Sequence, residues 1–165
     1  MIWGLSGTVW AFAGAGAAII GGGIGSAIGL SSACNVAAGI ITEDSEKFGR
    51  VLPIAAMPST QGIYGFITAI LVMIFFGLLL GDAEPAIEAK VGFTIFLACL
   101  PVATLGLVTG IYQGLTSAGA AGMVARRSEE TGRALIFPAL VETYAVFALI
   151  TTVLMLLSLQ SMYGF

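Results

Sequence analysis

The chain has 165 residues, of which 58% are hydrophobic and 9% are charged, with a formal net charge of −3. A soluble domain has about 25% charged residues, so this composition excludes an ordinary soluble protein and indicates an integral membrane protein. The sequence has no histidine, which removes the commonest catalytic base and transition-metal ligand. We expect no nucleic-acid partner.

Four uncharged runs follow one another, at residues 1–42, 51–81, 91–125 and, apart from Glu142, 134–165. Each exceeds the roughly 20 apolar residues that cross a bilayer, so we predict an all-α membrane protein with four transmembrane helices. The first run has no basic leading segment and no small-residue cleavage site, so we interpret it as a retained span. Cys34 and Cys99 lie within these runs, and we interpret them as unpaired small side chains.

The basic residues predict the orientation of these helices. The loops at 42–50 and 125–133 carry Lys47, Arg50, Arg126, Arg127 and Arg133, whereas Lys90 stands alone between the second and third helices. By the positive-inside rule, the two basic loops face the cytoplasm and both termini face the other side. We therefore divide the chain into a first transmembrane hairpin at 1–81, a non-cytoplasmic loop at 82–90 and a second hairpin at 91–165.

Small residues recur at every fourth position of the first and third predicted helices. The two stripes are Gly21, Gly25, Gly29, Ala33 and Ala37, and Gly106, Gly110, Gly114, Ala118 and Gly122. Small side chains let membrane helices approach closely. Close van der Waals packing then holds the helices together, because lipid supplies no hydrophobic drive for their association. The stripes superimpose when Gly21 is placed on Gly106, and the second and fourth helices align when Arg50 is placed on Arg133. The chain is therefore predicted to be a tandem repeat of one helical hairpin.

A repeat with a small-sided stripe implies further neighbours of the same kind, since repeat units bury their faces by stacking. We expect identical chains to stand side by side in a closed ring, with the stripes on the inner circle and the second and fourth helices facing lipid. The glycines assigned to this ring packing are Gly21, Gly25, Gly29, Gly106, Gly110 and Gly114. The alternative is ordinary helix pairing inside a monomeric four-helix bundle.

The second predicted helix carries polar residues on one face. Met57, Thr60, Gln61 and Tyr64 follow the i, i+3, i+4, i+7 spacing that places side chains together. Pro58 withholds an N–H group, so we expect a disturbed turn that leaves the Met57 backbone carbonyl free as a ligand.

The third and fourth helices add an amide and an acid to this set. Gln113 stands where the first repeat has Ile28, and Glu142 stands where it has Ser59. Holding an ionised carboxylate at membrane depth costs about 2.5–3.5 kcal/mol on insertion scales, so such residues usually mark an ion or proton pathway. The structural alternative is a protonated carboxyl hydrogen-bonded between helices.

Thr60, Gln61, Gln113, Glu142 and the Met57 carbonyl together offer oxygen ligands, which hard cations prefer. One carboxylate with neutral oxygens balances a monovalent ion, so we predict a Na⁺ site in which the Tyr64 hydroxyl holds the carboxylate. The alternative is H⁺ carried by Glu142 itself, because burial favours the neutral form of a carboxyl group.

The chain resembles the proteolipid rotor subunit (the c or K subunit) of V-type and A-type ATPases in its duplicated four-helix form. The resemblance lies in GIGSAIG at 23–29, GIYQG at 110–114, PSTQGIYG at 58–65 and VETY at 141–144. The resemblance to the sodium-translocating members implies that Na⁺ is bound by the Met57 carbonyl, Thr60, Gln61, Gln113 and Glu142. It also implies that Tyr64 bonds to the carboxylate. Ser59 replaces the glycine that is common in that type.

The resemblance also implies a rotor without catalytic activity of its own, in which ATP chemistry belongs to other subunits. Its partners would be identical subunits in a ring, a stator subunit with an essential arginine, central-stalk subunits at the cytoplasmic loops, and membrane lipid. We expect the plasma membrane of a prokaryote. Competing hypotheses are a small multidrug-type secondary transporter and a structural pore-forming proteolipid, which would not need Glu142.

Overall fold

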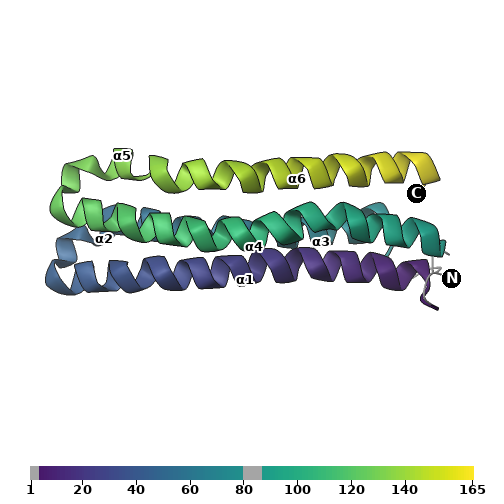
Figure 1. Ribbon diagram of the computed structural model, residues 1–165, viewed down its shortest axis with the longest axis horizontal. Coiled ribbons are helices and arrows are strands. Elements are labelled where there is room, and N and C mark those ends of the chain that lie inside the picture. The colour runs from purple at the N-terminus through teal and green to yellow at the C-terminus, as the bar shows by residue number, and fades with distance from the viewer. Residues whose placement is uncertain (1–3, 80–86) are drawn as a thin grey trace.

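The computed structural model describes residues 4–79 and 87–165 and consists of long helices arranged side by side (Figure 1). The helices are α1 (Gly7–Glu43), α2 (Phe48–Ala56), α3 (Thr60–Phe75), α4 (Ala89–Arg126), α5 (Thr131–Ala134) and α6 (Ile136–Tyr163). Short 3-10 turns join some of them, namely η1 (Ser45–Lys47), η2 (Met57–Ser59) and η3 (Ser128–Glu130).

Four helical stretches are long and apolar enough to span a membrane, at Gly7–Glu43, Ser45–Phe75, Ala89–Arg126 and Ser128–Tyr163. This finding confirms the predicted spans. The second hairpin starts at Ala89 rather than at residue 91, and most of the predicted loop at 82–90 lies outside the described residues. α1 has 37 residues and measures about 55 Å at 1.5 Å per residue. It therefore extends beyond a hydrocarbon core of about 30 Å.

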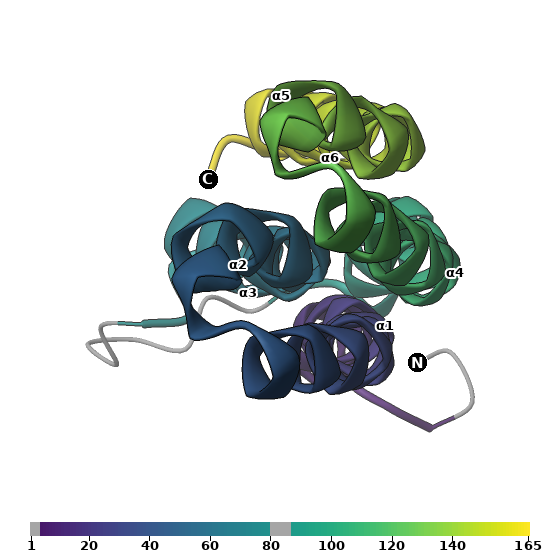
Figure 2. The same ribbon diagram turned by 90° about the vertical axis from the view of Figure 1, so that its left-hand side faces the viewer.

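The two hairpins are stacked in a staggered row. The start of α1 and the end of α6 lie at the same end of the bundle in Figure 1. The end-on view of Figure 2 places α1 at one edge, α3 and α4 in the middle, and α6 at the opposite edge. The most extensive contact is between α1 and α4, the first helices of the two hairpins.

The glycine stripes of α1 and α4 face each other within one chain. A Cβ atom added at Gly25 would lie 2.8 Å from the Leu107 Cα, and one added at Gly110 would lie 2.9 Å from the Gly25 Cα. Gly21 similarly meets Ala103, and Gly29 meets Gly110 and Gly114. The sequence predicts a role for these glycines in packing between chains, whereas the backbone contacts that the structure shows lie inside one chain. Packing between chains stays a prediction.

Prolines interrupt the second helix of each hairpin. Pro58 lies in the 3-10 turn between α2 and α3, and Pro138 follows the break at Leu135 between α5 and α6. Proline lacks the N–H that would bond to the carbonyl four residues earlier. The helix tightens at η2 because Met57 N–H bonds to the Ile54 carbonyl, three residues back.

Two apolar clusters fill the bundle on either side of a polar layer. One cluster lies toward the chain termini and includes Phe76, Ile95 and Leu156. The other lies toward the α1–α2 and α4–α5 loops and includes Ile54 and Val124. The buried amides of the predicted ion site, Gln61 and Gln113, lie between the two clusters, so the fold keeps these amides away from both bundle ends.

Candidate ion-binding site

The six predicted site residues lie along one continuous chain of hydrogen bonds. Thr60 Oγ1 donates to the Met57 carbonyl at 3.2 Å and to Gln61 Oε1 at 3.4 Å. Gln61 Nε2 donates to Gln113 Oε1 at 2.7 Å. The chain then passes from Gln113 to Glu142, which also accepts from Tyr64. Residues from α3, α4 and α6, and from the turn η2, thus converge on one place in the bundle.

The first hairpin supplies Met57, Thr60, Gln61 and Tyr64 from successive turns of one helix. Gln61 is fully buried, whereas Thr60 and Tyr64 are half-buried. The Met57 carbonyl differs from our expectation of a free ligand, because it accepts both the N–H and the hydroxyl of Thr60. The 3-10 turn around Pro58 brings the N–H and the hydroxyl of Thr60 within reach of the Met57 carbonyl. The carbonyl therefore accepts hydrogen bonds even though Pro58 interrupts the α-helical pattern.

Gln113 is the centre of the network. Its side chain is fully buried on α4, and its oxygen accepts from Gln61. Its Nε2 group donates to the Pro138 carbonyl at 3.1 Å and to Glu142 Oε2 at 3.4 Å. One amide therefore ties α3 to α6 and orients the carboxylate.

Glu142 lies half-buried on α6, with its two oxygens bonded to different helices. Tyr64 donates its hydroxyl to Oε1 at 2.7 Å, and Gln113 approaches Oε2. On its outer side, Glu142 lines a pocket of about 260 Å³ with Ala139, Thr143, Val146 and Phe147. The Glu142 carboxylate is thus hydrogen-bonded by α3 and α4 on its inner side and borders a pocket at the α6 surface on its outer side.

The chemistry of this group favours a small monovalent cation. Both ion pairs in the described part of the chain lie in the loops, Lys47 with Asp44 and Arg133 with Glu130, so neither neutralises Glu142. Across residues 4–79 and 87–165, no three His, Cys, Asp or Glu side chains come together as a metal-binding group. Glu142 bonds directly to Tyr64 and Gln113, and through Gln113 it is linked to further side chains that carry amide and hydroxyl oxygens. One carboxylate together with such neutral oxygens suits a hard ion of charge +1.

Three supporting contacts were not predicted from the sequence. The Pro138 carbonyl accepts from Gln113, and Thr116 Oγ1 donates to the Gln113 carbonyl at 2.9 Å. Ser26 Oγ accepts the Gly62 N–H at 2.7 Å and so ties α1 to α3 beside Gln61. Thr116 was detectable by its position one helical turn after Gln113, but the other two contacts cross between helices and leave no local pattern.

The family of the ATP synthase C subunit matches the chain twice, over residues 13–72 and 96–155. The chain belongs to this family. The starts of the two matches, at residues 13 and 96, differ by the same shift that places Arg50 on Arg133. The two matches confirm the predicted duplication and the predicted resemblance.

Two relatives extend the comparison within this family. The V-type sodium ATPase subunit K of Enterococcus hirae is 36% identical over 152 residues, which are 92% of this chain and 93% of the relative. The A-type ATP synthase subunit K of Methanocaldococcus jannaschii is 36% identical over 135 residues, which are 82% of this chain and 58% of that relative. One relative is thus named as a subunit of a V-type sodium ATPase and the other as a subunit of an A-type ATP synthase.

Proposed function

We propose that this protein is the rotor-ring subunit of a membrane rotary ATPase and carries Na⁺ at Glu142. The supporting observation is the closed network of Tyr64, Gln61, Gln113 and Glu142 at the middle of the bundle. A carrier of H⁺ needs only the carboxyl group, whereas the two buried amides add oxygens suited to a metal ion. The sodium ATPase subunit among the relatives supports the same ion.

In this proposal, Na⁺ is the cargo of the ring and is bound by Glu142, Thr60, Gln61, Gln113 and the Met57 carbonyl. Tyr64 and Gln113 hold the carboxylate in one rotamer, so little reorganisation accompanies ion entry. The ion enters and leaves on the α6 side, where Glu142 borders the pocket with Thr143 and Phe147.

Rotation would bring Glu142 past a stator subunit whose arginine competes with Na⁺ for the carboxylate and displaces it. The loops at 42–50 and 125–133 would face the cytoplasm and meet central-stalk subunits, and both termini would lie on the other side. ATP chemistry belongs to other subunits of the machine, to which rotation of the ring is coupled.

The test is carbodiimide labelling of Glu142 in the purified, full-length protein over a pH series. Carbodiimides react with protonated carboxyl groups, so bound Na⁺ should slow labelling. We expect less Na⁺ to be needed for half-protection as the pH rises, because fewer protons compete for the same oxygens.

KCl at the same concentration as NaCl is the control for ionic strength. The Glu142→Gln variant is the control for labelling at other carboxyl groups. Labelling that depends on pH but not on Na⁺ would contradict the sodium proposal and favour the same rotor coupled to H⁺. Ion-coupled ATPase activity that survives in the Glu142→Gln variant would contradict the rotor proposal itself.

A further inference from the structure

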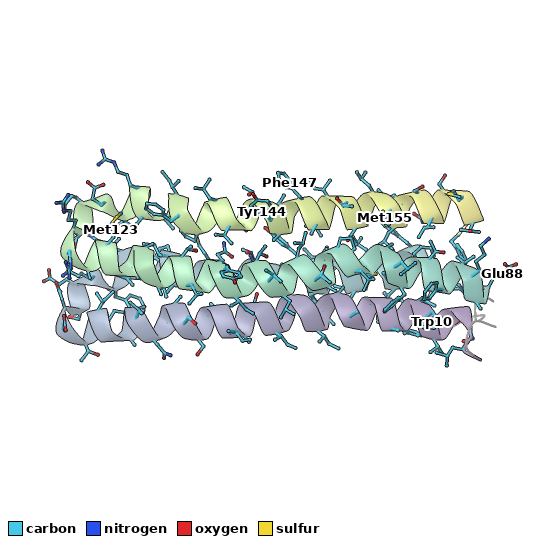
Figure 3. The ribbon with its side chains drawn as sticks, in the orientation of Figure 1. Trp10, Glu88, Met123, Tyr144, Phe147 and Met155 are labelled. Atoms are coloured by element: carbon cyan, nitrogen blue, oxygen red, sulfur yellow. The ribbon has the colours of Figure 1, made fainter. Side chains whose placement is uncertain are left out.

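A pocket with two arginines lies at the loop end of the second hairpin. Its volume is about 630 Å³, and the six residues that line it all come from the second hairpin, namely Met123, Arg127, Glu130, Arg133, Ile136 and Phe137. Figure 3 labels Met123 at this end of the bundle, away from Trp10 at the end near the termini. Ile136 and Phe137 are 55% and 53% exposed, so the single chain leaves this pocket open to a partner.

One of the two arginines in the pocket has no acidic partner. Arg133 Nη1 donates to both carboxylate oxygens of Glu130, at 2.9 and 3.0 Å. Arg127 takes part in neither of the two ion pairs found within residues 4–79 and 87–165. The pocket therefore keeps one positive charge, and its electrostatic complement is a partner that brings a carboxylate.

The loop of the first hairpin has the opposite balance of charge. Residues 42–50 carry one more acid than bases, whereas residues 125–133 carry one more base than acids. Asp44 already pairs with Lys47 at 3.2 Å. Glu46 is exposed and takes part in no ion pair among the residues that the structure describes. Glu46 is therefore the carboxylate of this turn that a partner can reach.

Glu46 is directed away from α4 of its own chain. It lies in the 3-10 turn η1 beside Lys47, and side chains that follow each other in a 3-10 turn project about 120° apart because three residues make one turn. The Lys47 Nζ atom reaches across to the Ala125 carbonyl on α4 at 2.9 Å. The pocket lies beyond this contact, toward α6, so the acid and the pocket occupy different flanks of one chain.

A ring would bring these two flanks together at the same height. Copies in a ring are related by rotation about one axis, and an axis along the helices leaves the height of every residue unchanged. The contact of Lys47 with the Ala125 carbonyl shows that both loops of one chain share that height. Figure 2 places α1 and α6 at opposite edges of the row, so the first hairpin of a following copy stands beside the pocket.

We propose that the pocket of each copy binds the acidic turn of the next copy, with Glu46 paired to Arg127. This inference rests on the ring assembly in the proposed function. The contact is head to tail, because it joins two different flanks, and a head-to-tail contact lets a ring close. The pair sets the order and axial register of the copies, since charge complementarity gives specificity while exposed ion pairs contribute little stability.

The contact is tested by cross-linking chains that each carry one cysteine. In chains with Cys34 and Cys99 replaced by alanine, Glu46→Cys is introduced into one chain and Arg127→Cys into a second chain with a different tag, and both are co-expressed. A bis-maleimide reagent spans the gap left by the two longer side chains. The purified assembly should give a dimer that contains both tags, and one cysteine per chain excludes links within a chain.

Each single variant, expressed alone, is the matched control. In a head-to-tail ring, position 46 of one copy faces position 127 of another and never a second position 46, so neither variant alone should give a dimer. Dimers from one variant alone would mean that identical faces meet and would overturn the proposal. An intact mixed assembly without dimers would overturn it too, and is the result expected if acidic lipid or another subunit fills the pocket.

Charge reversal tests the ion pair itself. Arg127→Glu should lower the fraction of chains in the oligomer at low salt, and adding Glu46→Arg should restore it because the pair is rebuilt with exchanged signs. Arg126→Glu is the control, since Arg126 is exposed in the same loop but does not line the pocket. High salt should shrink the loss, because it screens exposed charges. Equal losses at positions 126 and 127, or no restoration, would overturn the pairing.

The natural chain, measured in parallel, separates this inference from the proposed function. A monomeric natural chain, determined by native mass spectrometry, would overturn both. An oligomeric natural chain whose mixed variants assemble without cross-linking would overturn the contact alone. Cross-linked dimers in an assembly whose Glu142 is not protected by Na⁺ would support the contact and contradict the sodium proposal.

Discussion

Glu142 takes its hydrogen-bond donors from two different helices. Tyr64 on α3 binds one carboxylate oxygen and Gln113 on α4 approaches the other. Hydrogen bonds to an ionised group are shorter and about twice as strong as neutral ones. At the scale of single residues, these two donors make an acid tolerable at membrane depth.

Replacing Tyr64 by phenylalanine should weaken Na⁺ binding roughly tenfold. The ring stays but the hydroxyl is lost, and a hydrogen bond to a charged group contributes about 1.5–3 kcal/mol. The measurement is the Na⁺ concentration that half-protects Glu142 from carbodiimide. Tyr112→Phe is the control, because Tyr112 is exposed on α4. An equal effect of both variants would contradict a specific role for Tyr64.

Gln113→Ala should weaken Na⁺ binding more than Gln61→Ala. Gln113 bonds to Gln61, Pro138 and Glu142, whereas Gln61 bonds to Gln113 and Thr60. Hydrogen bonds between membrane helices average about 0.6 kcal/mol each, so neither variant should disperse the assembly. Sodium titrations of both variants and of the double variant check this order, and two unchanged affinities would remove the amides from the ligand set.

At the scale of helices, backbone contact between α1 and α4 is the main packing device. A Cβ at several stripe positions would meet backbone atoms of the other helix, which cannot move as a flexible side chain can. Van der Waals contact replaces the hydrophobic drive that lipid does not provide. The polar layer depends on this contact, because α1 holds α3 through Ser26 and Gly62 while α4 carries Gln113.

Gly25→Leu should prevent the chain from folding to its native packing, since its side chain would be forced into Leu107 on α4. Overpacking typically costs about 1–3 kcal/mol for small additions, and a whole isobutyl group against backbone exceeds that range. Gly23→Leu is the control, because a Cβ there meets nothing within 4 Å. Detergent-extracted yield and thermal stability should fall only for Gly25→Leu. Normal stability of that variant would refute the packing argument.

At the scale of the whole molecule, the α1–α2 loop of the first hairpin contacts the end of α4 in the second hairpin. This contact lies at the end of the bundle away from the termini. Lys47 Nζ donates to the Ala125 carbonyl at 2.9 Å and pairs with Asp44 at 3.2 Å. The lysine of the first hairpin therefore caps the last turn of α4, where the helix dipole favours a positive charge. This contact fixes the relative position of the two loops.

Lys47→Met should lower the free energy of unfolding by about 0.3–1 kcal/mol, which is the usual contribution of a positive charge at a helix C-terminus. Arg50→Met, at an exposed position in the same loop region, should have a smaller effect. Melting temperatures of the purified protein at low and high salt measure the difference, which should shrink as salt screens the charge. A larger loss from Arg50→Met would contradict the capping role of Lys47.

The amino-acid sequence by itself determined the four spans, the duplication and the identities of the candidate ligands. Those features follow from local quantities: the length of apolar runs, the regular spacing of glycines and the energetic cost of a carboxylate in lipid. The spacing of Met57, Thr60, Gln61 and Tyr64 placed them on one face because the helical period is fixed by backbone geometry.

Only the tertiary structure decided which faces meet. The glycine stripes pair inside the chain, the Met57 carbonyl is bonded to Thr60, and Gln113 finds the Pro138 carbonyl. The contacts between helices depend on the rotation and axial shift of one helix against another. In a membrane these are set by the sum of many weak contacts along the whole helix, so no short sequence pattern specifies them.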